Sequence, residues 1–359
     1  MIQLLHDEAT LLHETVELLG AKIRPALESP DRIRAIVSSL EAAGREIYSL
    51  TVSEEQALSV MQLAIATHGE DYINHLRTTH SDWLAAGLVE QHESVLPECF
   101  RLHNKAQSLL SPPRDLFARA GYYAFDMSTG IMKDSWRSIL ASANLAIQAA
   151  SMIAEDRTTP SPAQTVLALT RPPGHHCTGE QAGGYCYINN IALAVTRIRL
   201  INPSARFAIL DLDFHHGNGT QEIFWSDSSV FYASIHGQDE FPYYTGHASE
   251  VGPHNTILNL PLPAHSSFAA YQTQLTTALH AIQAFAADYL LVSLGFDTFR
   301  LDPLGSFQID MADYTTIARM VREITRSLPA VILLEGGYVI EKLGENVLAF
   351  INGWESVSE

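Results

Sequence analysis

The stretch FAILDLDFHHGNGT, residues 207–220, joins a run of apolar residues to a run of polar and metal-binding side chains. Its first four residues, 207–210, form a continuous apolar run, which is typical of a strand buried on both faces of a sheet. Similar short apolar runs occur at 165–170, 230–235, 289–294 and 330–334, and segments with helical spacing lie between them. This alternation predicts an α/β fold in which helices cover both faces of a mostly parallel central sheet.

The spacing of apolar residues predicts helices at 30–42, 53–66, 134–155, 189–200, 220–225, 268–286, 314–327 and 341–350. Strands are expected to be scarce before residue 160. The chain contains no repeat, low-complexity tract or linker, so a single domain over residues 1–359 is expected. The stretch 88–119 contains Pro97, Pro112 and Pro113 and has little periodicity. We expect a long irregular surface loop there that shapes an entrance.

The composition is acidic, because 40 Asp and Glu residues against 22 Lys and Arg residues give a formal net charge of −18 over 359 residues. Such a charge repels polyanions and attracts cations, so neither nucleic acid nor an anionic membrane is expected as a partner. No run reaches the ~18 apolar residues that a bilayer span needs, and a soluble protein is expected.

The N-terminal sequence MIQLLHDEATLLHE carries acidic residues where a secretory signal would need a basic start. The chain has three cysteines, Cys99, Cys177 and Cys186. An odd number in a long chain gives no indication of a disulfide framework. A reducing compartment, by default the cytoplasm, is therefore expected. Cys177 and Cys186 have no dedicated base beside them in the sequence, and we interpret them as small packing residues.

Polar residues follow each of the five apolar runs. In chain order these are RPPGHHC (171–177), DFHHGNGT (213–220), His236, GFDTFRLDPLG (295–305) and EGGY (335–338). Ligands of open α/β sheets bind beyond the carboxyl ends of the strands. The five strand ends are therefore expected to converge on one site.

Asp213 and His215 form an Asp-x-His pair at a strand end, where alternate residues point the same way and can hold one ion together. Asp297, after another strand, could be the third ligand. Two carboxylates and one imidazole suit a catalytic zinc ion with open positions, although iron(II) or manganese would fit the same ligands. Each of these residues alone is more often a cap or a turn residue, and it is their combination that favours a metal.

The adjacent histidines His175 and His176 follow two prolines and a glycine that would hold them in place. Paired histidines beside a metal can take a proton from metal-bound water and protonate the leaving nitrogen. Asp211 and Asn218 are candidates to fix the tautomers of the two rings. Tyr338, after two glycines, could donate a hydrogen bond to the oxyanion of a tetrahedral intermediate.

Together these residues predict a metal-assisted hydrolase of amide bonds. No Gly-x-Ser-x-Gly elbow is present, which disfavours a serine nucleophile. Neither a Walker phosphate loop nor a dinucleotide fingerprint follows a strand.

Six motifs in one order resemble the zinc-dependent histone deacetylase superfamily, which has an arginase-like three-layer α/β fold of about eight strands. The motifs are RPPGHHC, GGYCYINN (183–190), ILDLDFHHGNGT, SIHG (234–237), GFDTFRLDPLG and EGGY. Upstream, ESPDR (28–32), THGEDYINHL (67–76) and GYYAFD (121–126) look like the amino-terminal part of bacterial acetylpolyamine amidohydrolases. The resemblance thus spans nearly the whole chain.

The resemblance implies a role for each matching position. Zinc would be held by Asp213, His215 and Asp297, with His175 and His176 as the acid–base pair and Tyr338 polarising the acetyl carbonyl. Gly184, Tyr185 and Phe241 would line a narrow tunnel, and Arg32 would lie near an inner channel for acetate. Potassium would be bound around Asp211, Asp213, His215, Ser234 and Ile235, unless these form an ordinary strand end. Position 218 is an asparagine here, whereas the nuclear enzymes have an aspartate at that position. This difference leaves the order of the proton transfers undetermined.

The resemblance also implies the substrate, a small cationic amine such as acetylated putrescine, cadaverine or a spermidine-like molecule. The 88–119 loop could narrow the entrance and form a homodimer, and its carboxylates Glu93, Glu98 and Asp115 could meet the distant ammonium or be simply solvated. The alternatives are a lysine deacetylase acting on peptides or proteins, a catalytically silent metal-binding protein, and an arginase-like dimanganese ureohydrolase. The last needs aspartates that the strand ends at 213 and 297 do not supply.

Overall fold

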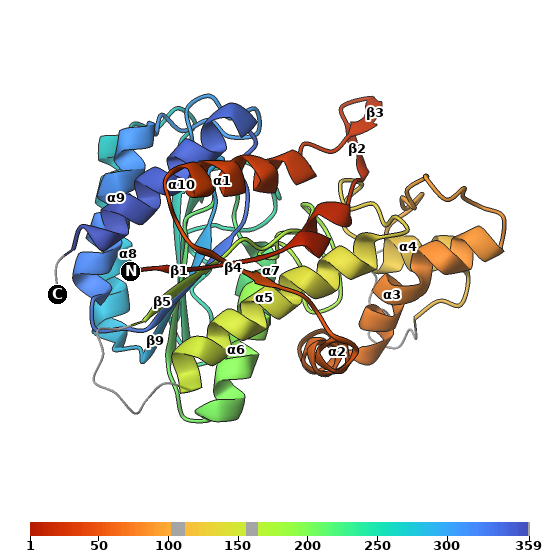
Figure 1. The fold of residues 1–359 in the computed structure, drawn as a ribbon, viewed down its shortest axis with the longest axis horizontal. Coiled ribbons are helices and arrows are strands. Elements are labelled where there is room, and N and C mark those ends of the chain that lie inside the picture. The colour runs from red at the N-terminus through yellow and green to blue at the C-terminus, as the bar shows by residue number, and fades with distance from the viewer. Residues whose placement is uncertain (102–111, 156–163, 358–359) are drawn as a thin grey trace.

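The computed structural model describes residues 1–101, 112–155 and 164–357, and its centre is a sheet of eight parallel strands (Figure 1). The strands lie in the order β4 (Ile47–Leu50), β1 (Gln3–Asp7), β5 (Thr165–Ala168), β10 (Ala330–Leu334), β9 (Tyr289–Leu294), β6 (Phe207–Asp211), β7 (Val230–Gly237) and β8 (Ile257–Leu262). The predicted fold class is confirmed, with a parallel sheet between two helical layers.

Helices cover both faces of the sheet (Figure 1). One face carries α1 (Pro30–Ala42), α8 (Phe268–Phe285), α9 (Met311–Thr325) and α10 (Ile340–Glu355), and the other carries α5 (Ser135–Glu155), α6 (Asn190–Ile201) and α7 (Asn218–Phe224). Successive residues of a strand point to opposite faces. Ile332 and Leu334 of β10 accordingly pack with the first layer, and Val331 and Leu333 pack with the second. This burial on both faces explains why the central strands are continuous apolar runs.

Three helices near the N-terminus form an extension beyond α5 (Figure 1). They are α2 (Glu54–His68), α3 (Glu70–Ala85) and α4 (Leu116–Tyr122). Ser53 and Gln56 close a capping box that starts α2, and Gly69, at φ 82°, allows the chain to turn directly into α3. A short 3-10 helix, η1 (Glu8–Leu12), and the antiparallel hairpin of β2 (Val16–Leu19) and β3 (Lys22–Pro25) complete the N-terminal region.

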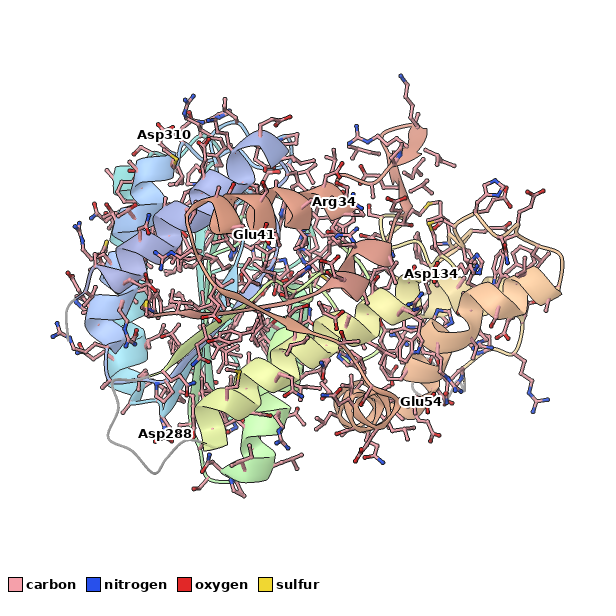
Figure 2. All side chains as sticks on the ribbon, viewed as in Figure 1. Arg34, Glu41, Glu54, Asp134, Asp288 and Asp310 are labelled. Atoms are coloured by element: carbon pink, nitrogen blue, oxygen red, sulfur yellow. The ribbon has the colours of Figure 1, made fainter. Side chains whose placement is uncertain are left out.

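Arg34 and Glu41 of α1 and Glu54 of α2 lie on the outer faces of their helices and are exposed (Figure 2). Among the described residues, no helix is both long enough and apolar enough to cross a bilayer.

The expectation that strands would be scarce before residue 160 was wrong, because β1 and β4 form one edge of the main sheet. Both strands are short, and β4 is largely exposed, so neither shows a continuous apolar run. The other edge strand, β8, was not predicted at all, since Asn259 and Pro261 interrupt its apolar sequence. In the expected loop at 88–119, the last residues already belong to α4, and residues 102–111 lie outside the described part of the chain.

The five strands whose ends carry the polar motifs are contiguous in the sheet, in the order β5, β10, β9, β6 and β7. Because all five are parallel, their carboxyl ends meet at one edge. The fold therefore places these motifs at one site.

Candidate active site

The structure brings Asp213, His215 and Asp297 together, as the sequence predicted. Asp213 and His215 follow β6 and Asp297 follows the neighbouring β9. One donor atom from each side chain can be chosen so that all three lie within 4.8 Å of one another. Nδ1 of His215 is 2.9 Å from Oδ2 of Asp297 and 3.3 Å from Oδ1 of Asp213. This is the donor set expected for one divalent ion.

The surroundings of these ligands fit a metal ion. Both aspartates are buried, and backbone amides of Gly336 and Phe214 donate to Asp213 Oδ2 and Asp297 Oδ1, each at 2.8 Å. A Cβ on Gly336 would lie 2.4 Å from Asp297 Oδ2 and 2.7 Å from Asp213 Oδ2. Glycine at this position therefore keeps space beside the two carboxylates that any side chain would fill.

The pKa values of His215 and Asp297 also favour a bound cation. Burial lowers the pKa of His215, but contacts with Asp213 and Asp297 outweigh this effect and raise the pKa to about 10. Burial and the charge of Asp213 raise the pKa of Asp297. Two carboxylates this close need a positive charge, which the protonated His215 ring supplies here and which a divalent cation would supply in place of that proton.

The paired histidines lie beside this triad, on the loop after β5, with ring centroids 4.0 Å apart. Nδ1 of His175 is 3.1 Å from Oδ2 of Asp211, and Nδ1 of His176 is 2.8 Å from Oδ1 of Asn218. Because both oxygens accept, each ring carries its proton on Nδ1, and Nε2 of neutral His176 keeps a free lone pair.

The two histidines differ in proton affinity. Burial lowers the pKa of His175, but the carboxylates of Asp213, Asp211 and Glu335 outweigh burial and raise it to about 10. Burial and the positive charges of His175 and His215 hold the pKa of His176 well below its usual value. Near neutral pH the pair therefore combines a charged ring with a neutral one, which divides the roles of charge stabilisation and proton transfer.

Tyr338 follows β10 and extends from a tight turn in which Gly337 has φ 120°. Its backbone amide donates to Asp302 Oδ2 at 2.7 Å, and the Arg32 guanidinium lies 5.0 Å from the ring centroid. Burial raises the pKa of Tyr338 well above its usual value, so the phenol remains an O–H donor at neutral pH.

The predicted tunnel residues surround the same place. A Cβ on Gly184 would lie 2.3 Å from the His176 ring and 2.9 Å from the Phe241 ring, so this glycine lies between the two. The Phe241 ring contacts His176 edge-to-face, with centroids 4.9 Å apart. Tyr185, at φ 65°, is 5.8 Å from Tyr338 between ring centroids and donates its hydroxyl proton to Glu17.

Arg32 is fully buried and donates from Nε to Gly337 O at 2.7 Å and from Nη1 to Glu28 Oε1 at 2.8 Å. Its predicted place beside an acetate channel stays a prediction. Among the residues expected around potassium, Asp211 and Ser234 are register partners in β6 and β7, and the Asp213 amide donates to Asp211 Oδ1 at 3.2 Å. Ile235 follows in β7 and is buried. Potassium at this strand end also stays a prediction.

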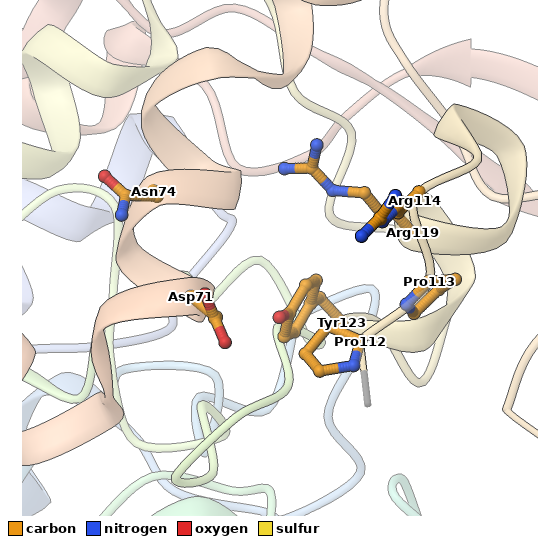
Figure 3. A pocket seen from close by; sticks show the side chains of 7 residues that line it. All are labelled: Asp71, Asn74, Pro112, Pro113, Arg114, Arg119 and Tyr123. Atoms are coloured by element: carbon orange, nitrogen blue, oxygen red, sulfur yellow. The ribbon is translucent and has the colours of Figure 1, made fainter. Parts of the chain in front are cut away.

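Two of the entrance carboxylates have local partners. Glu93 accepts the backbone amide proton of Glu90 at 2.8 Å, and Asp115 caps α4 by accepting from Ala118 N at 3.0 Å. Glu98 is exposed. A cavity of about 350 Å³ between α3 and α4 is lined by Asp71, Asn74, Pro112, Pro113, Arg114, Arg119 and Tyr123 (Figure 3). None of the predicted site residues lines it.

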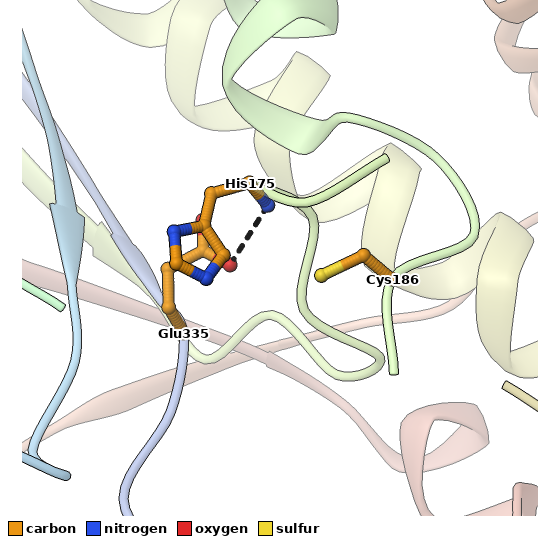
Figure 4. Close-up of side chains that lie close together, drawn as sticks. All are labelled: His175, Cys186 and Glu335. Carbon is orange, nitrogen blue, oxygen red and sulfur yellow. Dashed lines mark hydrogen bonds between the residues drawn. The ribbon is translucent and has the colours of Figure 1, made fainter. Parts of the chain in front are cut away.

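A second group of possible metal ligands, His175, Cys186 and Glu335, also lies close together (Figure 4). Its donors are already engaged, because Glu335 accepts backbone amide protons and the Cys186 thiol donates to Gly184 O. Burial raises the pKa of Cys186 well above its usual value, which keeps the thiol protonated and agrees with the packing role predicted for it.

The sequence analysis missed four residues that shape the site. Phe125 stacks with Phe241, with centroids 6.1 Å apart, and Asp126 accepts the backbone amide proton of Gly184 at 2.6 Å. The motif GYYAFD includes both, but nothing in its spacing shows what they contact. Asp302 and Glu335 lie within quoted motifs and hold backbone amides of other site loops. A partner of this kind can be identified only from the folded chain.

The chain is similar to known proteins over nearly its whole length. Residues 26–354 match the histone deacetylase domain. Acetylpolyamine amidohydrolase 2 of Pseudomonas aeruginosa is 35% identical over 364 residues, covering 99% of each chain, and acetylpolyamine amidohydrolase of Mycoplana ramosa is 33% identical, covering 97% of each. The crystal structure of acetylpolyamine aminohydrolase from Burkholderia pseudomallei has a TM-score of 0.88 at 30% identity, covering 99% of each chain. The chain therefore belongs to the histone deacetylase family and is a hydrolase of the deacetylase and amidohydrolase type.

Proposed function

We propose that the chain is a zinc-dependent amidohydrolase that removes acetyl groups from N-acetylated polyamines and releases acetate and the free amine. The observation that carries the chemistry is the triad of Asp213, His215 and Asp297, whose donor atoms lie within 4.8 Å of one another. The paired histidines and Tyr338 lie around this triad, at contiguous strand ends.

When bound, a divalent ion at this triad supplies a Lewis acid that lowers the pKa of a water molecule and polarises a carbonyl group. Neutral His176, with Nδ1 facing Asn218, takes a proton from the attacking water on Nε2 and returns it to the leaving nitrogen. His175, whose Nδ1 faces the Asp211 carboxylate, stabilises the negative charge that develops nearby. The Tyr338 hydroxyl donates to the oxygen of the acetyl group, where that charge accumulates.

The polyamine substrate is supported by three observations of different weight. Relatives named acetylpolyamine amidohydrolases match 97–100% of the chain, including its N-terminal helices. The Phe241 ring contacts His176 and stacks with Phe125, and such an apolar pair of rings suits an unbranched alkyl chain. A net charge of −18 favours a cationic amine, although this is the weakest argument. Homodimer formation through the 88–119 segment belongs to the same proposal.

The competing candidate is a lysine deacetylase that acts on peptides. Rates on N-acetylputrescine, N-acetylcadaverine and an acetyl-lysine peptide, measured on metal-quantified protein, separate the two. We expect the highest kcat/KM for an acetylated diamine. A preference for the peptide would overturn the proposed substrate, and hydrolysis of none of the three would overturn the proposed function. A hydroxamate should inhibit the active enzyme, because it chelates a metal through two oxygens.

A further inference from the structure

Glu335, the first residue after β10, is fully buried, and the proton-transfer roles proposed above do not use it. Its Oε2 accepts the backbone amide proton of Gly174 at 2.7 Å. The same oxygen accepts the backbone amide proton of His175 at 3.2 Å (Figure 4). Its Oε1 accepts the hydroxyl proton of Ser293, in β9, at 3.1 Å. One carboxylate thus joins the neighbouring strands β9 and β10 to the histidine loop that follows β5.

The segment 335–338 is attached to the other parts of the site as well. Gly336 N donates to the candidate metal ligand Asp213, and Tyr338 N donates to Asp302. Arg32 donates to the carbonyl oxygens of Glu335 and Gly337. The segment 335–338 therefore contacts the candidate metal ligand Asp213 and contains the hydroxyl donor Tyr338. Within this segment, Glu335 makes the hydrogen bonds to the histidine loop.

We propose that Glu335 is a positioning residue that fixes the His175–His176 loop relative to Asp213 and Tyr338. The proposal rests on the proton-transfer roles proposed above for the two histidines. Without this acceptor, the two buried amides of Gly174 and His175 would lose their partner, and the loop would move to find another. A small displacement of a group that transfers protons lowers turnover much more than it lowers substrate binding.

The hydrogen bonds carry the positioning role, and the charge of Glu335 makes the smallest of the three carboxylate contributions to the raised pKa of His175. Burial raises the pKa of Glu335 to about 7, so its carboxyl group is partly neutral near physiological pH. A glutamine has the same shape, and its carbonyl oxygen can accept from both amides. Its NH₂ group can then donate to Ser293, whose hydroxyl rotates to accept.

Three variants test the proposal by steady-state kinetics on N-acetylcadaverine, with metal content measured on each. Glu335→Ala should lower kcat about a hundredfold, with KM within about threefold of the wild type and metal content unchanged. Glu335→Gln should keep kcat within about threefold, because it keeps the hydrogen bonds. Ser293→Ala, which frees one side of the carboxylate, should lower kcat about threefold to tenfold at unchanged KM.

Thr165→Val is the matched control. Thr165 lies at the other end of β5 and accepts the indole proton of Trp354 at 3.2 Å, so the variant loses a buried hydrogen bond away from the site. It should lower the melting temperature and leave kcat unchanged.

The proposal is overturned if Glu335→Ala turns over like the wild type, or if Glu335→Gln loses as much activity as Glu335→Ala. If Glu335→Ala does not fold, the other two variants decide. An active Glu335→Gln with a slower Ser293→Ala supports positioning, and an inactive Glu335→Gln or an unaffected Ser293→Ala overturns it. A wild-type chain that hydrolyses no acetylated amine refutes the proposed function instead, and the two failures are therefore distinguishable.

Discussion

The floor and the entrance of the site are held by different forces. At the floor, Asp211, Asp213 and Asp297 are at most 1% exposed, and hydrogen bonds from the backbone or from neighbouring rings fix their oxygens. By entrance we mean here the exposed loop that carries Phe241, in which Tyr243 is 62% exposed and Tyr244 is 86% exposed. Their positions depend on ring contacts, at centroid distances of 6.0 Å from Phe241 to Tyr243 and 6.5 Å from Tyr243 to Tyr244.

The backbone of the loop that carries Phe241 has an unusual conformation. Asp239 and Tyr243, in the loop that carries Phe241, have φ values of 58° and 68°, in the left-handed region that side chains avoid. Backbone hydrogen bonds from Tyr243 N to Glu240 O and from Tyr244 N to Pro242 O hold this turn. A floor fixed by many hydrogen bonds tolerates few changes and should determine turnover. An entrance held by ring contacts and these two backbone hydrogen bonds, with its aromatic side chains exposed, should determine substrate preference.

Removal of the metal should have the largest effect, because it leaves the two floor carboxylates without their cation. A chelator should abolish hydrolysis and lower the melting temperature, and one equivalent of zinc should restore both. The stabilisation expected from bound metal is about 4 kcal/mol at a thousand times its Kd. Activity that survives complete metal removal, checked by elemental analysis, would contradict the assignment of Asp213, His215 and Asp297.

His176→Ala should lower kcat by about 10³- to 10⁴-fold, at the upper end of the range for losing a general base and acid. Metal content should stay at one ion per chain, because His176 is not one of the three ligands. The KM for N-acetylcadaverine should change little. Retained turnover would remove His176 from the proton path and leave His175 as the base.

Tyr338→Phe should lower kcat about a hundredfold, the scale for losing one donor to an oxyanion. Only the hydroxyl group is lost, and the ring remains to pack against the Arg32 guanidinium. The melting temperature should therefore stay close to that of the wild type. Turnover near the wild-type value would show that another donor binds the carbonyl oxygen.

Substitutions at the entrance should have the smallest effect on catalysis, and they should change KM and leave kcat unchanged. Tyr244→Ala should raise the KM for N-acetylcadaverine about twofold to fivefold at unchanged kcat, since an exposed aromatic face attracts an ammonium group weakly. Tyr244→Phe keeps the ring and is the matched control. A neutral N-alkylacetamide of similar length should show no change in KM. An equal loss on both substrates would mean that the ring acts by packing alone.

Much of the site could be predicted because each motif is local in the sequence. Asp213 and His215 are two residues apart at a strand end, so they share one direction, and the apolar run before them identifies the strand. The same reasoning identified His175, His176, Asp297 and Tyr338. The partners Asp211 and Asn218 were found because they lie in the same strand–loop segment as the candidate metal ligands Asp213 and His215.

The central strands, their order along the chain and the polar residues at their ends could be predicted, because they depend on periodicity and on neighbouring residues. Three features follow from the packing of distant segments: β1, β4 and β8 complete the sheet, Phe125 stacks with Phe241, and Glu335 accepts an amide proton from the histidine loop. Glu335 and Gly174 are 161 residues apart, and no local pattern records such a pairing. The physical reason is that a buried amide must find an acceptor, and the packing of β5, β10 and β9 determines which acceptor is within reach.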